Sequence, residues 1–334
     1  MNQFDANRVL VTGATGFIGK SLCEYLLTCG FKVRALTRQN TFSCVQEKNN
    51  YEWVMGDITK PETLKKLCED VDIVFHLAGF AHAYEEENPE FNNIHQKVNY
   101  QGTVNILNES ISAGIKRFIY FSSVKAGASS DNCIDEDCTA QPNDAYGLAK
   151  RQAEQIVLSL CEANGITPII LRPTLVYGPG VKGNLAAMIK GISRGYFPTP
   201  PSIQNYKSMV SIDDLCRVAF LASQAENPHN KIYIVTDDIP YSTAQITQNI
   251  RNALGKKKSK FYCPLWVWIT LAKAGDIVQK ITHKRFPINT QAVKKLFSSA
   301  LYCSCYIKNE LHFEPRLTLS DVLPSMIKVK NSND

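Results

Sequence analysis

Tyr146 and Lys150 are four residues apart, so they would share one face of a helix. A free phenol is a weak base at neutral pH because its pKa is about 10. A neighbouring ammonium, together with the positive charge of an oxidised nicotinamide, would favour the phenolate. Ser123, expected at the end of a sheet strand, would hydrogen-bond the substrate oxygen whose proton Tyr146 transfers. These three residues predict proton transfer coupled to oxidoreductase chemistry on a nicotinamide cofactor.

A glycine-spaced segment near the N-terminus predicts the place where that cofactor binds. Gly13, Gly16 and Gly19 lie between a predicted strand at 8–12 and a predicted helix at 17–29. In a βαβ unit these glycines permit a tight turn, a close approach of the pyrophosphate and close helix–strand packing. The helix N-terminus then offers N–H donors to the phosphates.

The residue at the end of the second predicted strand bears on the choice of cofactor. An acid there binds the ribose 2′-OH of NAD, but this chain has Thr37 followed by Arg38. A guanidinium can pair with a 2′-phosphate, whereas a carboxylate would repel it. We therefore expect NADP(H), with NAD(H) as the alternative if Arg38 is only a solvated charge at the strand end.

The elements that must position these residues alternate regularly along the chain. We expect helices at 17–29, 89–113 and 145–163, and a further helix that opens at Pro61 and is capped by Thr59. This alternation predicts an α/β fold of the Rossmann type, with a doubly wound parallel sheet. The expected strands are 8–12, 32–37, 52–55, 72–77, 116–121, 167–172 and 231–235.

Beyond residue 178 the pattern changes to helices separated by Pro- and Gly-bearing turns, at 183–194, 242–254, 264–279 and 289–297. They predict a smaller C-terminal substrate-binding lobe above the carboxyl edge of the sheet, where ligands of open α/β sheets bind. The expected division is a cofactor domain of residues 1–178 plus about 210–236, and a lobe of 179–209 and 237–330.

Composition excludes several classes of function. The 334 residues carry a net charge of +6 without a blocky basic pattern, so nucleic acid is not an expected partner. The 11 cysteines lack zinc-site spacing. We expect reduced thiols rather than disulfides or a metal site. The N-terminus has no signal segment, which favours a cytoplasmic protein.

One apolar stretch, residues 261–272, follows a lysine-rich run at 256–260. It is too short for a transmembrane segment, which needs about 20 residues. Contact with a membrane surface is one interpretation. We favour the other, a helix of the substrate lobe preceded by a charged turn.

The chain resembles the extended short-chain dehydrogenases/reductases, in the group of nucleotide-sugar epimerases, dehydratases and reductases. The resemblance covers nearly the whole chain, as far as the segment 311–315, which is similar to the group's C-terminal "LGF-x-P" turn. It rests on segment 12–19, Gly56-Asp57, segment 76–79, Asn99, Gly102-Thr103, Ser122-Ser123, Tyr146, Lys150, Arg172-Pro173 and segment 177–179.

This resemblance implies roles for individual residues. Ser123 would polarise a carbonyl, Tyr146 would deliver a proton and Lys150 would hold the cofactor ribose. Lys125 is equally compatible with a solvated loop lysine and with a sugar or diphosphate contact. The implied cofactor contacts, together with Arg38, are Gly13, Thr15, Gly16, Phe17, Ile18, Gly19, Asp57, Ile58, Leu77, Ala78, Gly79, Asn99, Ser122, Tyr146, Lys150 and Pro173. The implied substrate contacts are His82, Lys125, Tyr177, Asn184, Leu185 and Lys207.

The residues after Ser123 discriminate within the group. Dehydratases resemble one another in a Thr-Asp-Glu run, and both acids are missing from Ser123-Val124-Lys125. UDP-galactose 4-epimerases usually continue from the serine into Val-Tyr-Gly, where this chain has Ala126-Gly127-Ala128. A second departure is Leu175, where epimerases and dehydratases tend to carry Asn.

The segments 122–125 and 176–184, with His82, are similar to bacterial 4-reductases of UDP-2-acetamido-2,6-dideoxy-4-hexuloses, which serve surface-polysaccharide synthesis. We therefore expect an NAD(P)H-dependent 4-reductase of a UDP-sugar. The first alternative is an NAD-retaining UDP-hexose or UDP-HexNAc 4-epimerase, and the second a non-catalytic NADP-binding sensor or scaffold. The helices at 90–113 and 145–163 resemble the group's dimer interface and imply a homodimer.

Overall fold

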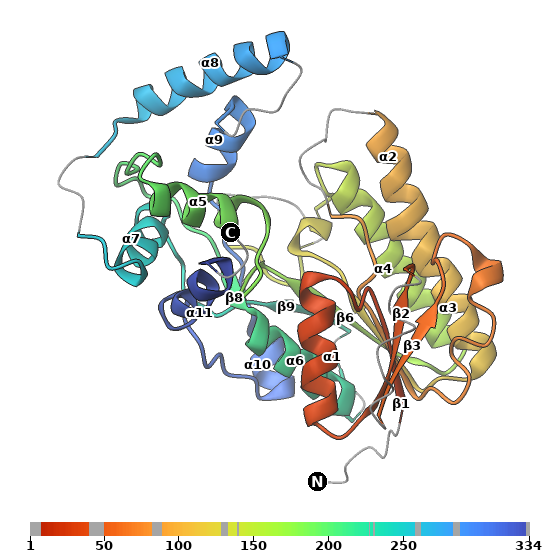
Figure 1. The fold of residues 1–334 in the computed structure, drawn as a ribbon. Helices are drawn as coiled ribbons and strands as arrows, with labels where there is room; N and C mark the ends of the chain where they lie inside the picture. The colour runs from red at the N-terminus through yellow and green to blue at the C-terminus, as the bar shows by residue number, and fades with distance from the viewer. Residues whose placement is uncertain are drawn as a thin grey trace.

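A parallel sheet covered by helices on both faces forms the centre of the molecule (Figure 1). The computed structural model describes residues 8–39, 50–81, 89–127, 133–138, 140–226, 228–229, 231–257, 262–282 and 288–331. His82, expected to contact substrate, lies outside the described residues.

The sheet has seven parallel strands in the order β3-β2-β1-β4-β5-β6-β9. The order reverses between β1 and β4, and dinucleotides bind at the carboxyl ends of the strands at such a switch point. All seven strands were predicted, and the Rossmann-type fold is confirmed. The strands are β1 (Arg8–Thr12), β2 (Lys32–Thr37), β3 (Tyr51–Met55), β4 (Ile73–His76), β5 (Arg117–Phe121), β6 (Thr167–Pro173) and β9 (Ile232–Val235).

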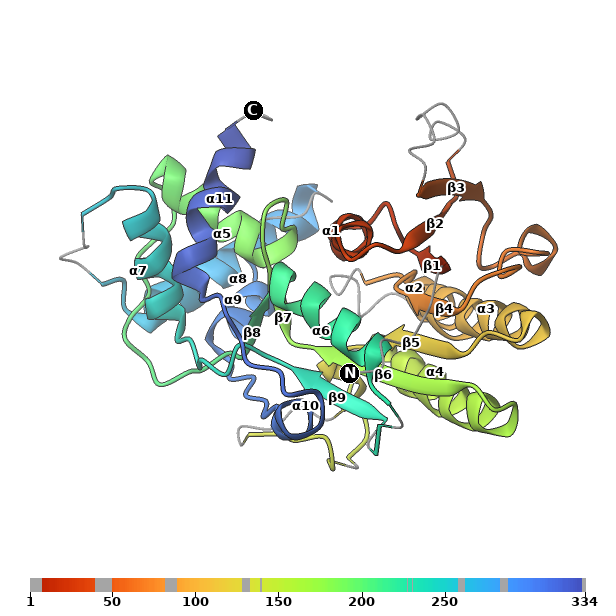
Figure 2. The same cartoon turned by 90° about the horizontal axis from the view of Figure 1, so that it is seen from below.

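Helices cover the two faces of the sheet because its central strands, such as β1, β4 and β5, are buried on both sides. α1 (Phe17–Thr28) and α6 (Ile212–Gln224) pack on one face, together with α10 (Cys305–Leu311). α3 (Gly102–Ala113) and α4 (Ala145–Ala163) pack on the other (Figure 2).

The predicted helix at 89–113 is present, but it has three parts. α2 (Pro89–His95) passes through a π-helical segment, Gln96–Gln101, into α3. Such π segments recur at functional sites. Asn99, an expected cofactor contact, lies in this segment and is fully buried.

The C-terminal lobe has its own core, made by helices that pack beside the carboxyl end of the sheet (Figure 1). A two-stranded parallel sheet joins this lobe to the rest of the molecule. It pairs β7 (Leu175–Tyr177) with β8 (Met209–Ser211), which were not predicted because each has only three residues. The lobe helices are α5 (Gly183–Arg194), α7 (Thr243–Ala253), α8 (Leu265–Thr282), α9 (Thr290–Phe297) and α11 (Leu319–Asn331).

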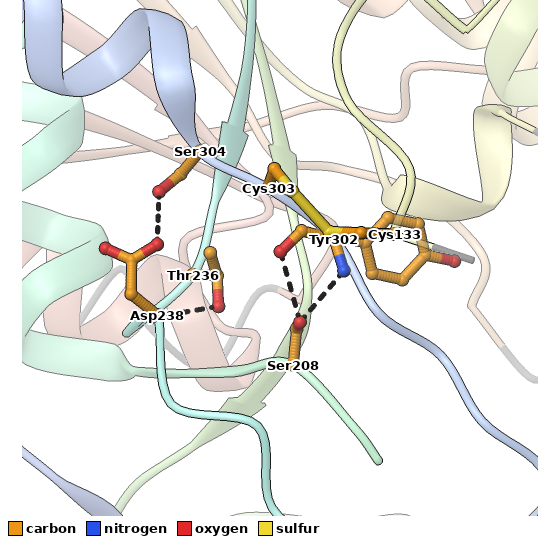
Figure 3. The surroundings of a disulfide bond; sticks show 7 residues. All are labelled: Cys133, Ser208, Thr236, Asp238, Tyr302, Cys303 and Ser304. Atoms are coloured by element: carbon orange, nitrogen blue, oxygen red, sulfur yellow. Dashed lines mark hydrogen bonds between the residues drawn. A yellow bond between two sulfur atoms is a disulfide. The ribbon is translucent and has the colours of Figure 1, made fainter. Parts of the chain in front are cut away.

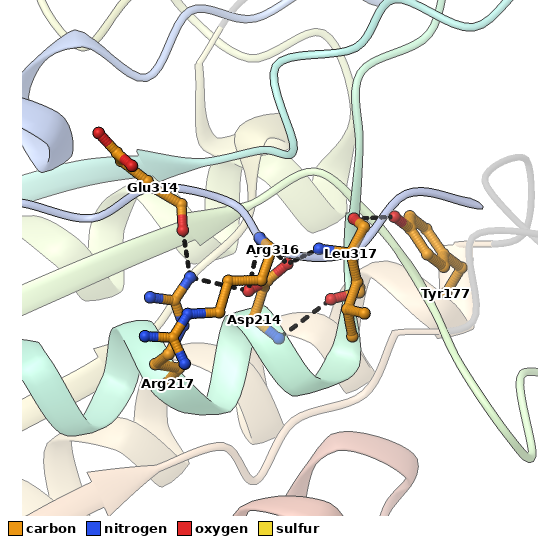
Figure 4. Close-up of polar contacts among 7 residues, drawn as sticks. Tyr177, Asp214, Arg217, Glu314, Arg316 and Leu317 are labelled. Atoms are coloured by element: carbon orange, nitrogen blue, oxygen red, sulfur yellow. Dashed lines mark hydrogen bonds and ion pairs between the residues drawn. The ribbon is translucent and has the colours of Figure 1, made fainter. Parts of the chain in front are cut away.

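Asp214, in the first turn of α6, holds the segment between α10 and α11. Its carboxylate accepts the N–H groups of Arg316 and Leu317 at 3.1 Å and the guanidinium of Arg217 at 2.9 Å (Figure 4). Arg217 also donates to the carbonyl of Glu314. The segment 312–317 is therefore fixed by a buried acid that the sequence analysis did not single out.

The prediction of a helix that begins at Pro61 is wrong. Only one 3₁₀ turn, Pro61–Thr63, forms, and its N-cap is Lys60. The Thr59 hydroxyl donates to Asp57 at 2.9 Å instead of capping. The following chain cannot continue the helix because Lys66 adopts a positive φ of 64°.

The expectation of reduced thiols is wrong for one pair, because Cys133 and Cys303 form a disulfide (Figure 3). They are 170 residues apart in sequence. Parallel backbone pairing brings them together: the N–H of Cys303 donates to the carbonyl of Ile134 at 2.9 Å. Spacing along the chain carries no signal of such a contact.

None of the helices in the described ranges is long and apolar enough to cross a bilayer.

Candidate active site

The turn between β1 and α1 has the geometry of a phosphate-binding loop. Gly13 has φ of +69°, and a Cβ there would lie 2.8 Å from the main-chain nitrogen of Ala78. A Cβ on Gly19 would lie 2.1 Å from the carbonyl oxygen of Gly13. Gly16 is the N-cap of α1 and provides no side-chain cap. The N–H groups of the first turn, where Thr15 is exposed, therefore remain available to an anion.

A threonine hydroxyl joins this turn to the next strand end. Thr12 Oγ1 accepts the N–H groups of Leu77 and Ala78, both at 3.1 Å, and lies 2.7 Å from Nδ1 of His76. His76 is fully buried, and its other nitrogen lies 3.0 Å from Oγ1 of Thr103. Burial lowers the pKa of His76 to about 3, so the ring is neutral and acts as a hydrogen-bonding spacer. The ends of β1 and β4 are thereby fixed at the switch point.

The end of β2 carries no acid. The side chain of Thr37 is buried and accepts the N–H of Gln39 at 3.1 Å, whereas Arg38 is exposed. Burial alone would raise the pKa of Asp57, but two hydrogen bonds from Thr59 and the nearby charge of Arg38 outweigh it and lower this pKa. Arg38 and Asp57 thus border the same edge of the crevice.

Asn99 shapes the loop after β4. Its side chain donates to the carbonyl of Phe80 at 2.9 Å and accepts the N–H of Phe80 at 2.7 Å. A Cβ on Gly79 would lie 2.9 Å from Oδ1 of Asn99 and 3.6 Å from Nζ of Lys150. Gly79 therefore lies between Asn99 and Lys150, where a side chain would collide with Asn99.

The three expected catalytic residues lie together. Asp144 caps α4 by accepting the N–H of Gly147 at 2.7 Å, which places Tyr146 in the first turn. Ser123, after β5, forms a side-chain hydrogen bond with Tyr146. Burial raises the pKa of Tyr146, while Ser123 and the charge of Lys125 act in the opposite direction. The net direction is opposite to the one that the Tyr–Lys spacing predicted.

Lys150 lies one turn further along α4 and is 4% exposed. Its ammonium donates to the carbonyl of Phe121 at 2.8 Å and lies 4.6 Å from the centre of the Tyr120 ring. Burial lowers the pKa of Lys150 to about 8, and the carboxylate of Glu154 opposes this effect. The charge of Lys150 is therefore held beside the site without a direct ion pair to Tyr146.

Lys125 is not a free loop lysine. Its ammonium pairs with Asp144 at 2.7 Å and lies 6.0 Å from the centre of the Tyr146 ring. The main-chain N–H of Lys125 donates to Oγ of Ser123 at 3.2 Å. Lys125 thus belongs to the same polar cluster as Ser123 and Tyr146, two of the expected catalytic residues.

One buried acid beside the site, Glu154, was missed by sequence reasoning, and so was its pairing with Arg172. Glu154 is 1% exposed and forms a bidentate pair with Arg172, at 2.8 and 2.6 Å. Ser122 donates its hydroxyl to the same carboxylate at 2.6 Å, so any cofactor contact of Ser122 would use its main chain. The available signal was the position of Glu154, four residues beyond Lys150 on the same helix face.

The remaining expected contacts divide into two groups. Phe17 and Ile18 are half-buried in the first turn of α1, and Ile58 packs where a Cβ on Gly102 would meet it at 2.7 Å. Pro173 is the buried last residue of β6. These residues border the carboxyl edge of the sheet, where the predicted cofactor site lies.

The expected substrate contacts in the lobe are brought together less well. Tyr177 is fully buried and donates its hydroxyl to Asp237 at 2.9 Å and to the carbonyl of Leu317 at 3.0 Å. Lys207 donates to the carbonyls of Lys295 and Ser298 at the end of α9. Both side chains are hydrogen-bonded within the lobe, so the structure does not present them as substrate contacts.

Asn184 and Leu185 begin α5, with Asn184 exposed and Leu185 in the lobe core. The expected substrate contact Asn184 is therefore on the surface, whereas Leu185 is buried.

Comparison with known proteins fits this geometry. Residues 9–236 match the NAD dependent epimerase/dehydratase family. A UDP-glucose 4-epimerase of Vibrio cholerae is 30% identical over 282 residues, which cover 82% of this chain and 85% of that protein. The chain belongs to the NAD-dependent epimerase/dehydratase family. The nicotinamide cofactor and the enzyme class predicted from the sequence are confirmed at this level.

Other members of the family are similar over most of their length. A protein of Escherichia coli O157:H7, N-acetyl-alpha-D-glucosaminyl-diphospho-ditrans,octacis-undecaprenol 4-epimerase, is 27% identical over 89% of this chain and 87% of its own. The structure of a UDP-glucose 4-epimerase of Thermotoga maritima with UDP-glucose superposes with a TM-score of 0.74 at 22% identity, covering 98% of this chain and 99% of that one. At that identity the structural likeness shows the fold.

Proposed function

We propose that this family member reduces the C4 carbonyl of a UDP-4-keto-6-deoxy-HexNAc with NADPH, in the synthesis of surface polysaccharide. The observation that carries the proposal is the end of β2, where a buried Thr37 and an exposed Arg38 stand in place of an acid. A guanidinium there favours a 2′-phosphate. A net reductase consumes reduced cofactor at each turnover. Arg38 at the end of β2 favours NADPH as that cofactor.

The arrangement of Ser123, Tyr146 and Lys150 supports a role for Tyr146 as the proton donor of this reduction. Bound NADPH would supply a hydride to C4 of the sugar. The phenol of Tyr146 would give its proton to the carbonyl oxygen, which Ser123 would polarise, so that the ketone becomes an alcohol. Because burial raises the pKa of Tyr146, the phenol stays protonated at neutral pH. Lys150, fixed by the carbonyl of Phe121, would hold the cofactor ribose.

The loop that follows Ser123 argues against a dehydratase reaction, in which the sugar loses water. Val124 and Lys125 stand where dehydratases resemble one another in two acids, and Lys125 is paired with Asp144. No carboxyl in the segment 123–126 can remove or deliver the protons of a dehydration. Reduction at C4 by a bound nicotinamide cofactor asks the protein only for a proton donor and a polarising group, and Tyr146 and Ser123 would supply them.

An NAD-retaining 4-epimerase is the second candidate. It is favoured by the names of two relatives, the 4-epimerases of Vibrio cholerae and Escherichia coli O157:H7. The second name places the sugar on a polyprenyl diphosphate. A substrate panel should therefore include both a UDP-sugar and a lipid-diphosphate sugar.

The test begins with protein purified without added cofactor, then denatured, with the released nucleotide assayed. We expect no stoichiometric NAD, and oxidation of NADPH only when UDP-4-keto-6-deoxy-HexNAc is supplied. Retained NAD at one equivalent, with interconversion of UDP-HexNAc epimers, would establish the epimerase instead.

Two variants sharpen the test. Arg38→Ala should weaken NADPH by more than about tenfold and leave NADH nearly unchanged, since one charge-assisted contact is lost. Tyr146→Phe should lower turnover by about 10²–10⁴-fold while cofactor still binds. Unchanged biological function of the Tyr146→Phe protein would favour a non-catalytic sensor or scaffold.

We further propose a homodimer formed through the helices at 90–113 and 145–163. Exposed amides lie along these helices, with Gln96 donating to Gln152 at 2.8 Å. Sedimentation of the full chain tests the oligomeric state.

A further inference from the structure

Helix α8 is attached to the lobe by one narrow side. Trp268 and Ala272 pack with Val293 of α9, and Trp268 lies edge-on to Phe297 with ring centres 5.6 Å apart. The only acid in α8, Asp276, accepts the N–H of Thr290 at 3.1 Å at the start of α9. Apolar packing and this hydrogen bond fix how α8 is rotated about its axis.

The opposite side of α8 is apolar and exposed. Trp266 is 69% exposed, Ile277 59% and Ile281 73%, and Ile269 adds 44%. The spacing 266, 269, 277, 281 repeats at helical intervals, so these side chains form one stripe. Figure 1 shows α8 at the outer edge of the lobe, with α9 on its inner side. Lys273 lies between Ile269 and Ile277 on this side of the helix. An exposed apolar stripe of this kind marks an interaction surface.

The stripe is accompanied by positive charge. Lys273 and Lys280 are exposed on α8. Lys257, before α8 in the sequence, and Lys294, on α9, are exposed as well. The outward side of α8 carries no carboxylate, since Asp276 points to α9. An amphipathic helix with Trp and Ile on one side and lysines among them has the chemistry of an interfacial helix. Lysine stems can lie along apolar surface while the ammonium reaches the lipid headgroups.

We propose that the outward side of α8 docks on the surface of a bilayer that contains anionic lipids. The helix has 18 residues, about 27 Å of length, and would lie flat in the interface without crossing it. The aromatic and isoleucine side chains would enter the headgroup region, and the lysines would pair with lipid phosphates. This inference does not depend on which reaction the active site performs.

A second copy of this chain is a poorer occupant of the same surface. Antiparallel pairing of two α8 helices would bury Lys273 and Lys280 against another lysine-bearing face that offers no carboxylate. A buried ammonium without a partner is strongly unfavourable. The charge pattern therefore complements an anionic bilayer and opposes self-association.

Vesicle flotation of the full-length protein tests the proposal. We compare vesicles of phosphatidylcholine alone with vesicles that contain about 30 mol% phosphatidylglycerol. We expect binding to the anionic vesicles, reduced at about 0.5 M salt because screening shortens the reach of the lysines. Trp53→Phe protein keeps the exposed Trp266 and the buried Trp268. Its quenching by brominated acyl chains, compared with that of Trp53→Phe/Trp266→Phe protein, would then report contact of Trp266 with the bilayer.

Variants decide the outcome. Lys273→Glu/Lys280→Glu and Ile277→Ser/Ile281→Ser should each lower the partition coefficient by at least about tenfold. Met55→Ser, which removes a side chain 62% exposed on β3, should bind like the unaltered protein. Absence of binding to anionic vesicles overturns the proposal. A loss of vesicle binding in Met55→Ser as large as the loss in the α8 variants overturns it too. A dimer that Ile277→Ser/Ile281→Ser dissociates, without vesicle binding, would assign the surface to a second copy.

Discussion

Glu154 and Arg172 form a fully buried, bidentate ion pair one turn of α4 beyond Lys150, with N–O distances of 2.8 and 2.6 Å. The pair joins α4, which carries Tyr146 and Lys150, to strand β6. Ser122, beside Ser123, donates to the same carboxylate. Helix α4, which carries the proposed catalytic residues Tyr146 and Lys150, and the segment before the proposed catalytic Ser123 are thus both held by one buried carboxylate.

Removing one partner of this pair should be costly. Glu154→Gln leaves the Arg172 guanidinium buried without its counter-charge, and we expect a loss of about 3–5 kcal/mol in the free energy of unfolding. Glu154→Met/Arg172→Met removes both charges and should lose much less. Urea denaturation at neutral pH measures both variants, and a Glu154→Gln loss below about 1 kcal/mol would contradict the assignment.

The hydroxyl of Thr12 should support both folding and cofactor binding. Thr12→Val leaves the N–H of Ala78 without its acceptor, which should cost about 1–3 kcal/mol, while the N–H of Leu77 keeps the main-chain carbonyl of residue 12 at 3.3 Å. It should also weaken nicotinamide cofactor binding, because the loop after β4 lines the crevice. Thr12→Ser keeps the hydroxyl and is the matched control. Calorimetric titration and thermal unfolding give the two readouts, and equal behaviour of the valine and serine variants would refute the role.

The raised pKa of Asp237 should make the free energy of unfolding depend on pH. Burial between two tyrosines raises its pKa from 3.8 to about 6, although hydrogen bonds from Ile239, Tyr177 and Tyr241 act against this. The folded state therefore binds the proton more tightly, so this contribution is present at low pH and is lost as pH rises through about 6.

For Asp237→Asn, the stability difference from the unaltered protein should shift in favour of the variant by about 2–3 kcal/mol between about pH 4 and pH 8. Comparing the two proteins removes the effect of other groups, such as His76, which titrate equally in both. A difference that stays constant across this range would show that Asp237 remains ionised in the folded protein throughout.

His312 ends α10 in the left-handed region, with φ of 48°. The similar turn in the family carries glycine there, and a side chain in this conformation costs about 1 kcal/mol. His312→Gly should therefore raise the free energy of unfolding by about that amount. Gly195→Ala is the mirror control: φ is +81° at the end of α5 and a Cβ would meet nothing within 4 Å, so only backbone strain should appear. Destabilisation by His312→Gly would mean that the imidazole makes a compensating contact.

The sheet was predictable because its strands are short apolar runs separated by helices with regular spacing. The grouping of the three expected catalytic residues was predictable for a similar reason: Ser123 follows a strand end, and Tyr146 and Lys150 lie on one helix face. Local pattern was sufficient for both.

Partners that only the tertiary fold brings together were not predictable. Cys133 meets Cys303 across 170 residues, and Tyr177 turns toward Asp237 instead of the crevice. Lys207 satisfies the end of a helix that is 88 residues away. In each case the residue type suits two environments, and the choice between them depends on packing.

The most direct test of the proposed reaction follows the hydride. Protein supplied with NADPH deuterated at the transferable C4 position and with UDP-4-keto-6-deoxy-HexNAc should yield a UDP-6-deoxy-HexNAc with deuterium at sugar C4, one for each NADPH oxidised. NADH should serve less well. No oxidation of NADPH with this ketone, together with interconversion of the C4 epimers of UDP-HexNAc by a protein that releases bound NAD on denaturation, would contradict the reductase and establish an epimerase.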